Sequence, residues 1–214
     1  MTKEQFGPEW RTKFEEIIAR FRRPTDRIFD DGFQAISFKE RQYPGSEIKQ
    51  PGNLIMIYPG VSPDGLAKAQ NEIIAPMPRP LAEFLLWSNG LKMGPLSLHG
   101  TKAEKPQPVS LLYQNIRERY EDQAEDTVGL GGLVGQHSIA HYFLHCDGHV
   151  DLVAGRKITD IVETWPSYEA MVLAEVRRLS RFFDDDGNPL CTHRDMLMPR
   201  HLEWESICEA EANQ

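Results

Sequence analysis

The 214 residues contain few cysteines and no long apolar run, the features that identify disulfide-rich and membrane proteins. The three cysteines, Cys146, Cys191 and Cys208, form no CxxC pair, so neither a disulfide framework nor a redox motif is expected. No apolar run approaches the ~20 residues that a membrane helix requires, and no apolar signal core follows the polar start of the chain. We therefore expect a soluble, cytoplasmic protein with reduced thiols and no membrane partner.

Positive charge is also sparse. The chain has 24 lysines and arginines against 32 aspartates and glutamates, which gives a formal net charge of -8. Contacts with phosphates need clustered Lys and Arg, so binding to nucleic acid is not expected. An acidic surface instead suits a basic protein partner, because opposite charges favour association.

Sequence signatures of catalysis are absent, since the chain contains no GxSxG, HExxH or kinase-type motif. Residues 129–135, GLGGLVG, match neither the Walker pattern nor GxGxxG, and they precede an expected strand, whereas a phosphate-binding loop opens a helix. We interpret them as a flexible connection. Residues 184–188, DDDGN, lack the spacing of a calcium-binding EF-hand and are interpreted as a solvated turn. Neither catalysis nor a bound cofactor is expected.

Regular apolar patterns are present, and they predict a mixture of helices and strands. Apolar residues at helical spacing predict amphipathic helices over residues 8–22, 78–90, 109–120 and 168–183. Short apolar or alternating runs predict strands over residues 33–38, 54–58, 96–100, 139–146, 149–154 and 161–165. The polar residues 40–53 form a loop or a hairpin connection. These elements predict an α+β single domain, with a mixed or largely antiparallel central sheet and helices packed around it.

The ends of two helices carry local signals. Ser167 has the side chain preferred at a helix N-cap, immediately before the last predicted helix. Asn89-Gly90 is expected to close the helix over residues 78–90 with a left-handed cap. Beyond Asn188 the chain is polar, and we expect an extended or loosely packed tail.

Histidines recur at intervals of four residues, at His137, His141, His145 and His149. On a helix, this spacing would place them on one face, where they could bind a metal ion. The residues between them are apolar and aromatic, however, and favour a strand.

The turn within this segment decides which histidines share a face of the strand. Asp147-Gly148 predicts a two-residue type I′ hairpin turn, which pairs Cys146 with His149 and leaves His145 one step further along. His149 then faces away from the preceding histidines, since side chains alternate along a strand. No bound metal is expected. The candidate ligands that could still share a face are His137, His141 and His145.

Three segments carry a resemblance to a known family. Residues 77–100, MPRPLAEFLLWSNGLKMGPLSLHG, contain a proline-led helix, an Asn-Gly pair and a following strand. Residues 141–153, HYFLHCDGHVDLV, form a late hairpin, and residues 161–179, IVETWPSYEAMVLAEVRRL, form a closing segment. Together they resemble the SUKH superfamily, which includes the fungal cell-wall assembly regulators and many bacterial toxin-immunity proteins. The matching positions are Pro78, Phe84, Leu85, Asn89, Gly90, Gly100, Asp147, Gly148, Trp165 and Ser167.

The resemblance implies an α+β domain over residues 1–187, with an enlarged region at residues 22–71 and a C-terminal extension at residues 188–214. It implies no catalysis, and the matching residues look structural. The recurrent role of the family is to bind another protein. We therefore expect a non-catalytic protein-binding domain, most concretely an immunity protein that neutralises a cognate toxin by direct binding. The alternatives are a regulatory adaptor of the cell-wall-regulator type and a metal-dependent enzyme that uses His137, His141 and His145.

A basic toxin domain would meet carboxylates on such an immunity protein. The acidic residues expected to form this contact are Glu118, Glu121, Asp122, Glu125 and Asp126. The alternative interpretation of the same residues is a solvated loop without a partner.

Overall fold

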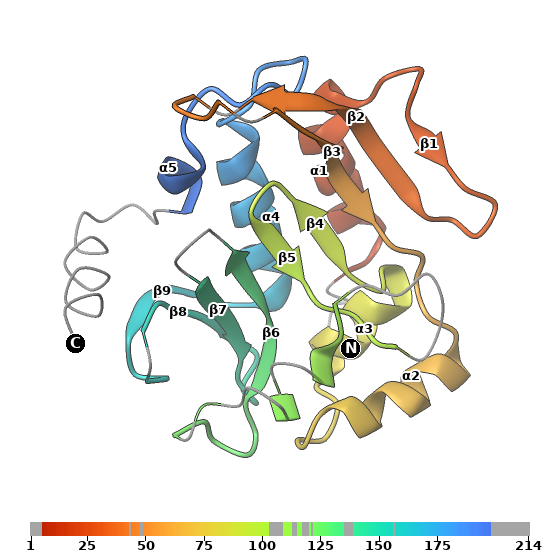
Figure 1. The fold of residues 1–214 in the computed structure, drawn as a ribbon. Coiled ribbons are helices and arrows are strands. Elements are labelled where there is room, and N and C mark those ends of the chain that lie inside the picture. Colours follow the sequence, from red (N-terminus) through yellow and green to blue (C-terminus); the bar gives the residue numbers. More distant parts are fainter. Residues whose placement is uncertain are drawn as a thin grey trace.

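The computed structural model describes residues 6–197, except residues 43, 48, 103–108, 113–114, 117–119, 121, 135–138 and 156. In this part of the chain, nine strands form one antiparallel sheet (Figure 1), and they follow one another across the sheet in chain order. The α+β class and the largely antiparallel sheet are therefore confirmed. No helix in the described ranges is both long and apolar enough to cross a membrane.

The elements have the following bounds. The strands are β1 (Arg27–Ile28), β2 (Gln34–Gln42), β3 (Lys49–Ile57), β4 (Leu91–Met93), β5 (Leu96–Leu98), β6 (Val128–Val134), β7 (Ile139–Leu144), β8 (Val150–Val153) and β9 (Ile161–Trp165). The helices are α1 (Pro8–Ile18), α2 (Pro63–Ala69), α3 (Arg79–Trp87), α4 (Tyr168–Ser180) and α5 (His193–Leu197), with short 3₁₀ turns η1 (Ala19–Phe21) and η2 (Gln70–Glu72).

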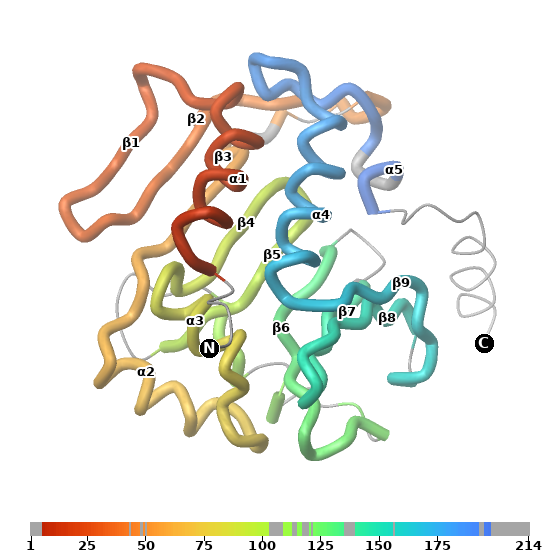
Figure 2. Tube along the Cα trace, turned by 180° about the vertical axis from the view of Figure 1, so that it is seen from behind, coloured from red at the N-terminus to blue at the C-terminus, as the bar shows by residue number. Residues whose placement is uncertain are grey.

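Helices α1 and α4 lie side by side across one face of the sheet (Figure 2). The indole Nε1 of Trp10 in α1 donates a hydrogen bond to the carbonyl oxygen of Glu169 in α4, at 3.1 Å. The ring of Phe6 packs edge-on against Phe84 of α3 and Tyr168 of α4, with centroids 5.4 and 5.3 Å apart. Aromatic packing thus joins the N-terminal segment, α3 and α4 in one core.

The last long helix forms as its sequence predicts. The Oγ of Ser167 accepts a hydrogen bond from the backbone N–H of Ala170 at 3.2 Å, which is the geometry of an N-cap. The apolar stripe along α4 is buried against the sheet and α1, and it comprises Tyr168, Val172, Val176 and Leu179.

The region at residues 22–71 extends the central sheet. Residues 40–53, for which the sequence predicts a loop or a hairpin connection, contain a hairpin, because β2 and β3 pair throughout residues 40–42 and 49–51. Arg41 is buried beneath it, where its Nε donates to the carbonyl oxygen of Gly187 and its Nη1 to that of Gly52, both at 2.7 Å. The turn after α4 is therefore hydrogen-bonded to this hairpin, and water is not its only hydrogen-bonding partner.

Residues 188–197 pack onto the domain, so the expectation of a loosely packed tail is wrong for them. Met196 is fully buried and Leu197 is 5% exposed. The carbonyl oxygen of Met196 accepts a hydrogen bond from Nη1 of Arg178 at 2.8 Å, which fixes α5 against α4. The rest of the predicted extension, residues 198–214, lies outside the described residues.

Most of the glycine-rich stretch forms β6, so its interpretation as a flexible connection is wrong. β6 is buried and pairs with β5 on one side and β7 on the other. Gly131 has a φ of 128° at a bulge, and a Cβ there would overlap the carbonyl oxygen of Ser97. A Cβ on Gly132 would overlap the carbonyl oxygen of Ala140. These glycines are required because the neighbouring strands approach too closely for a side chain.

Helix α3 ends differently from the expectation. It ends at Trp87, and Ser88 is already extended, with φ -148° and ψ 125°, so the predicted left-handed cap is wrong. Gly90 has a positive φ of 115°, but it lies beyond the helix end. The side-chain amide of Asn89 instead donates to the carbonyl oxygen of Thr101 at 3.1 Å and accepts from its N–H at 2.7 Å. Asn89 therefore ties the end of α3 to the segment after β5.

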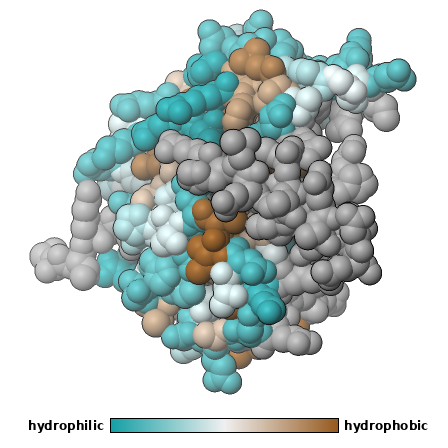
Figure 3. Space-filling view, turned by 90° about the vertical axis from the view of Figure 1, so that its left-hand side faces the viewer, coloured by the Kyte–Doolittle hydropathy of each residue, from teal (hydrophilic) through white to brown (hydrophobic). Residues whose placement is uncertain are grey.

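Exposed hydrophobic side chains are dispersed over the surface. Figure 3 shows one side of the molecule, on which they form small groups within a largely hydrophilic surface. The large ones come from many elements: Ile28, Phe29, Phe38, Ile74, Leu86, Val109, Ile116, Val134, Ile161 and Leu190. Such scattered residues are normal on a protein surface and do not define an interface.

A buried ion pair within α4 is hydrogen-bonded to a tyrosine of β7. Glu175 is 2% exposed, and its Oε2 accepts hydrogen bonds from Oη of Tyr142 at 2.8 Å and from Nη2 of Arg178 at 2.7 Å. Burial, together with the neighbouring carboxylate of Glu175, raises the pKa of Tyr142 well above its ordinary value, so the phenol remains a hydrogen-bond donor.

Glu175→Ala should lower the free energy of unfolding by about 3–5 kcal/mol, because it leaves the largely buried Arg178 without its carboxylate. Tyr142→Phe removes one hydrogen bond to a charged group and should lower it by about 1.5–3 kcal/mol. Glu16→Ala on the exposed side of α1 is the control, with an expected change within about 0.5 kcal/mol. Urea unfolding followed by circular dichroism measures all three variants. Equal stability of the Glu175→Ala and Glu16→Ala proteins would contradict the role given to Glu175.

Candidate functional site

The β7–β8 hairpin is closed by a three-residue loop, Cys146 to Gly148, because Leu144 pairs with Val150. The N–H of Gly148 donates to the carbonyl oxygen of His145 at 2.9 Å, and Gly148 has a φ of 95°. Neither of the two other loop residues has a positive φ. This is a turn followed by a left-handed glycine, so the prediction of a two-residue type I′ turn is wrong.

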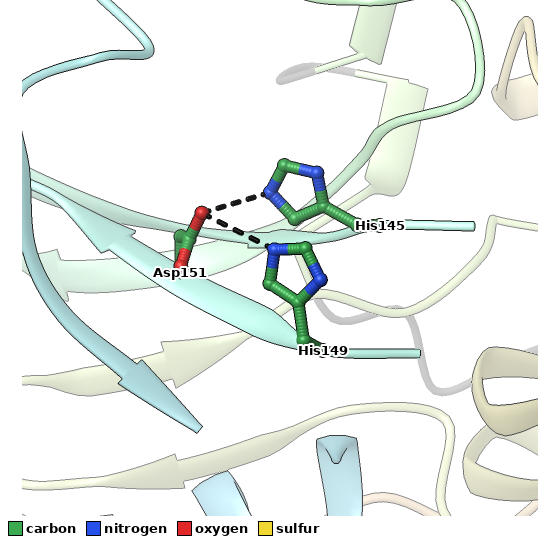
Figure 4. Close-up of side chains that lie close together, drawn as sticks. All are labelled: His145, His149 and Asp151. Carbon is green, nitrogen blue, oxygen red and sulfur yellow. Dashed lines mark ion pairs between the residues drawn. The ribbon is translucent and has the colours of Figure 1, made fainter. Parts of the chain in front are cut away.

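The longer loop places His145 directly opposite His149, so the prediction that they face opposite sides is also wrong. The N–H of His145 donates to the carbonyl oxygen of His149 at 3.0 Å. Their imidazole rings are stacked, with centroids 4.0 Å apart and planes 9° from parallel. Asp151 lies two residues beyond His149 and points to the same side (Figure 4). The structure thus brings together His145, His149 and Asp151, which we call the His–Asp cluster.

The carboxylate of Asp151 lies at the centre of the His–Asp cluster and is 5% exposed. Its Oδ2 lies 3.0 Å from Nε2 of His145 and 3.5 Å from Nε2 of His149. Its Oδ1 accepts a hydrogen bond from Oγ1 of Thr164 in β9 at 2.5 Å. Groups on β9 and at the end of β7 therefore hold the carboxylate of β8 in place.

The two imidazoles of the His–Asp cluster have different surroundings. Nδ1 of His149 lies 2.5 Å from Oδ1 of Asp147, which fixes the ring from its outer side. Bonds from His149 hold the pKa of Asp147 below its ordinary value, so this residue is a carboxylate. Nε2 of His145 is buried and, within the described part of the chain, makes no well-directed hydrogen bond despite its closeness to Asp151.

Burial lowers the pKa of His145, and the neighbouring His149 lowers it further, while Asp151 and Asp147 act in the opposite direction. The net effect favours the neutral imidazole at pH 7. The site thus combines a neutral imidazole with a buried carboxylate, and both nitrogen–oxygen pairs converge on Oδ2 of Asp151.

The predicted candidate ligands that the structure describes, His141 and His145, do not assemble into one site. His137 lies outside the described residues. The ring of His141 is on the same strand but packs against the rings of Tyr120 and Phe143, with centroids 5.7 and 6.3 Å apart. Of the predicted set, only His145 belongs to the His–Asp cluster.

Sequence reasoning missed His149 and Asp151 as members of one site with His145. The available signal was their i, i+2 spacing, which places two residues of one strand on the same face. Whether His145 shares that face depends on the hairpin register, which differs by one residue between a two-residue and a three-residue loop.

The acidic segment lies beside the hairpin loop. A contact between the carboxyl group of Asp126 and the thiol of Cys146, through a hydrogen bond and charge, raises the pKa of that thiol. Asp122 accepts the N–H of Ile158 with both oxygens at 3.2 Å, and Glu125 is exposed. Two of the predicted acidic residues, Glu118 and Glu121, lie outside the described residues.

The remaining positions of the family resemblance lie in the scaffold. Phe84 and Leu85 are fully buried in α3, and Pro78 precedes the first turn of that helix. Gly100 leaves no space for a Cβ next to the backbone of Asn89. Trp165 is 6% exposed at the end of β9. These positions belong to the core or border it, and they supply no group to the His–Asp cluster.

Two comparisons with known proteins found no match. No protein-family model matches this chain, and no curated protein matches its sequence.

A second buried histidine gives the fold a pH dependence. His99 is 8% exposed, and its Nδ1 has no hydrogen-bond partner among the described residues. Burial lowers its pKa to about 4, and the neighbouring His141 and Lys92 contribute in the same direction. In the unfolded chain the pKa of a histidine is about 6.5. Below pH 6.5 the unfolded chain therefore binds a proton that the folded chain does not, and stability is lost as the pH falls towards 4.

His99→Leu should remove this contribution. The free energy of unfolding of the wild type, minus that of the variant, is expected to fall between pH 6.5 and 4, by at most about 1.4 kcal/mol per pH unit. Urea unfolding at several pH values between 4 and 7.5 measures the difference. Parallel stability curves for wild type and His99→Leu would show that His99 is not buried in its neutral form.

Proposed function

We propose that this chain is a non-catalytic, SUKH-like protein-binding domain, and most concretely a cytoplasmic immunity protein that neutralises a cognate toxin by direct binding. The observation that carries the proposal is the junction of the acidic segment with the β7–β8 loop, where Asp126 contacts Cys146. It is joined by the motif resemblance in residues 77–100, 141–153 and 161–179.

Three buried charged residues, Glu72, Glu175 and Arg41, support a role in the scaffold of the domain. The carboxylate of Glu72 accepts hydrogen bonds from the hydroxyls of Thr101 and Ser110 and from the N–H of Lys102 at 2.7 Å. Glu175 and Arg41 are likewise engaged with partners inside the fold. Groups that are saturated in this way stabilise the packing of distant segments and offer no free acid or base to a substrate.

The acidic surface is suited to a basic partner. Asp122, Glu125 and Asp126 are exposed on one segment, and Asp147 is exposed on the hairpin loop that touches it. We call these four residues the acidic surface. Carboxylates from two segments of the chain then act together, which steers a basic protein towards this end of the molecule.

Co-expression with the product of the adjacent gene tests the immunity role. We expect the chain to restore growth of cells that express this product and to co-purify with it in a stable complex. A complex with cell-wall or signalling proteins, without any rescue, would favour the regulatory adaptor of the cell-wall-regulator type. If the chain neither rescued growth nor formed a complex, the immunity role would be refuted.

Charge reversal tests the acidic surface. Glu125→Lys/Asp126→Lys/Asp147→Lys should weaken the complex at least about tenfold, mainly through slower association, and should reduce the salt dependence of the association rate. The matched control is Glu16→Lys/Glu47→Lys/Asp64→Lys, which changes the net charge equally at exposed positions of α1, the β2–β3 turn and α2. Surface plasmon resonance at several salt concentrations measures both. An equal effect of the two triple variants would assign the loss to net charge and remove the acidic surface from the proposal.

A further inference from the structure

We infer that the His–Asp cluster is a binding site for a divalent transition-metal ion, with Zn²⁺ as the best fit. The ligands would be Nε2 of His145, Nε2 of His149 and Oδ2 of Asp151. Two imidazoles and one carboxylate form a donor set that Zn²⁺ and its first-row neighbours prefer, whereas Ca²⁺ and Mg²⁺ prefer oxygen alone. The inference is independent of the proposed protein partner.

The spacing of the donor atoms fits one small ion. All three groups offer a ligand atom within 4.8 Å of the others. Ligands about 2.0–2.1 Å from Zn²⁺ lie about 3.3 Å apart in a tetrahedron. The two measured nitrogen–oxygen distances, 3.0 and 3.5 Å, fall on either side of this value. One ion can therefore lie between the three groups once the two rings tilt towards it, since the lone pair of each Nε2 lies in its ring plane and the planes are only 9° from parallel.

The outer partners of the ligands orient them towards a common point. Asp147 accepts the Nδ1 proton of His149, so in the neutral ring the lone pair of Nε2 faces Asp151. Thr164 holds the far oxygen of Asp151 and leaves Oδ2 directed at the imidazoles. A carboxylate behind a histidine and a fixed ligand carboxylate are the usual outer shell of a metal site.

The geometry at Nε2 of His145 is a further observation in favour of a ligand. Its Nε2 is buried, lies close to Asp151 and lacks a well-directed hydrogen bond among the described residues. A metal ion would give this nitrogen a well-directed partner next to the carboxylate of Asp151. The parallel stacking of the two rings, at 4.0 Å, already brings both nitrogens to the same side of the hairpin.

The site would keep at least one position open. Three protein ligands leave a tetrahedral ion with one further position, which water would occupy. The side chains of His145 and His149 are 24% and 33% exposed, so the site lies close to the surface, with the ligating Nε2 of His145 itself buried. The ion would hold β7 and β8 together next to their loop.

Zinc binding to the full chain, purified without a histidine tag and freed of metal by a chelator, tests the inference. Titration with ZnCl₂ in a calorimeter is expected to give one ion per chain. His145→Gln and His149→Gln should each weaken binding at least about 100-fold, since each removes a ligand. Asp147→Asn should weaken it by about 10–100-fold, since outer-shell carboxylates contribute that much. Asp147 is exposed in the loop, so this variant also covers the case in which a ligand variant does not fold.

His141→Gln is the matched control, because His141 lies on the same strand as the cluster but packs against Tyr120 and Phe143. It should retain wild-type affinity. Co²⁺ substitution should give the intense visible absorption of a tetrahedral site in the wild type and in His141→Gln, and lose it in His149→Gln. Substoichiometric zinc, or an equal loss in His141→Gln and His149→Gln, would overturn the inference.

Discussion

The packing at the centre of the molecule depends on the register between β7 and β8. In this register Tyr142 and Leu152 are paired and buried, and the phenol of Tyr142 reaches Glu175 in α4. Phe143 and Asp151 form the neighbouring pair, with their side chains on the other face. A slip by one residue would exchange the two faces and turn the aspartate towards the helices. The loop that ends at Gly148 and the apolar core therefore select the same pairing.

Buried polar groups extend this order to segments that are distant in sequence. Arg41 fastens the β2–β3 hairpin to the turn at Gly187, and Arg178 fastens α4 to Met196. Such groups are unfavourable in an apolar interior unless their hydrogen bonds are made, so each also specifies which segments must meet. Through them, the region at residues 22–71 and residues 188–197 become parts of one packed structure.

The acidic surface and the His–Asp cluster are neighbours that share one residue. Asp147 is exposed to solvent, and it also holds the ring of His149 from outside. A divalent ion in the cluster would add positive charge beside the acidic surface and weaken its attraction for a basic partner. Metal binding and partner binding would therefore be coupled through electrostatics, although each is proposed on separate observations.

The amino-acid sequence determined those features that depend on nearby residues. The stripe of α4, the cap at Ser167 and the existence of a hairpin at Asp147-Gly148 all follow from local patterns. Tertiary structure decided the rest. Gly131 belongs to a strand because the backbone of Ser97 lies against it, and Asn89 bonds to Thr101 in place of capping α3. The His–Asp cluster also required the fold, because Asp-Gly permits loops of two or three residues, and only pairing across the sheet selects between them.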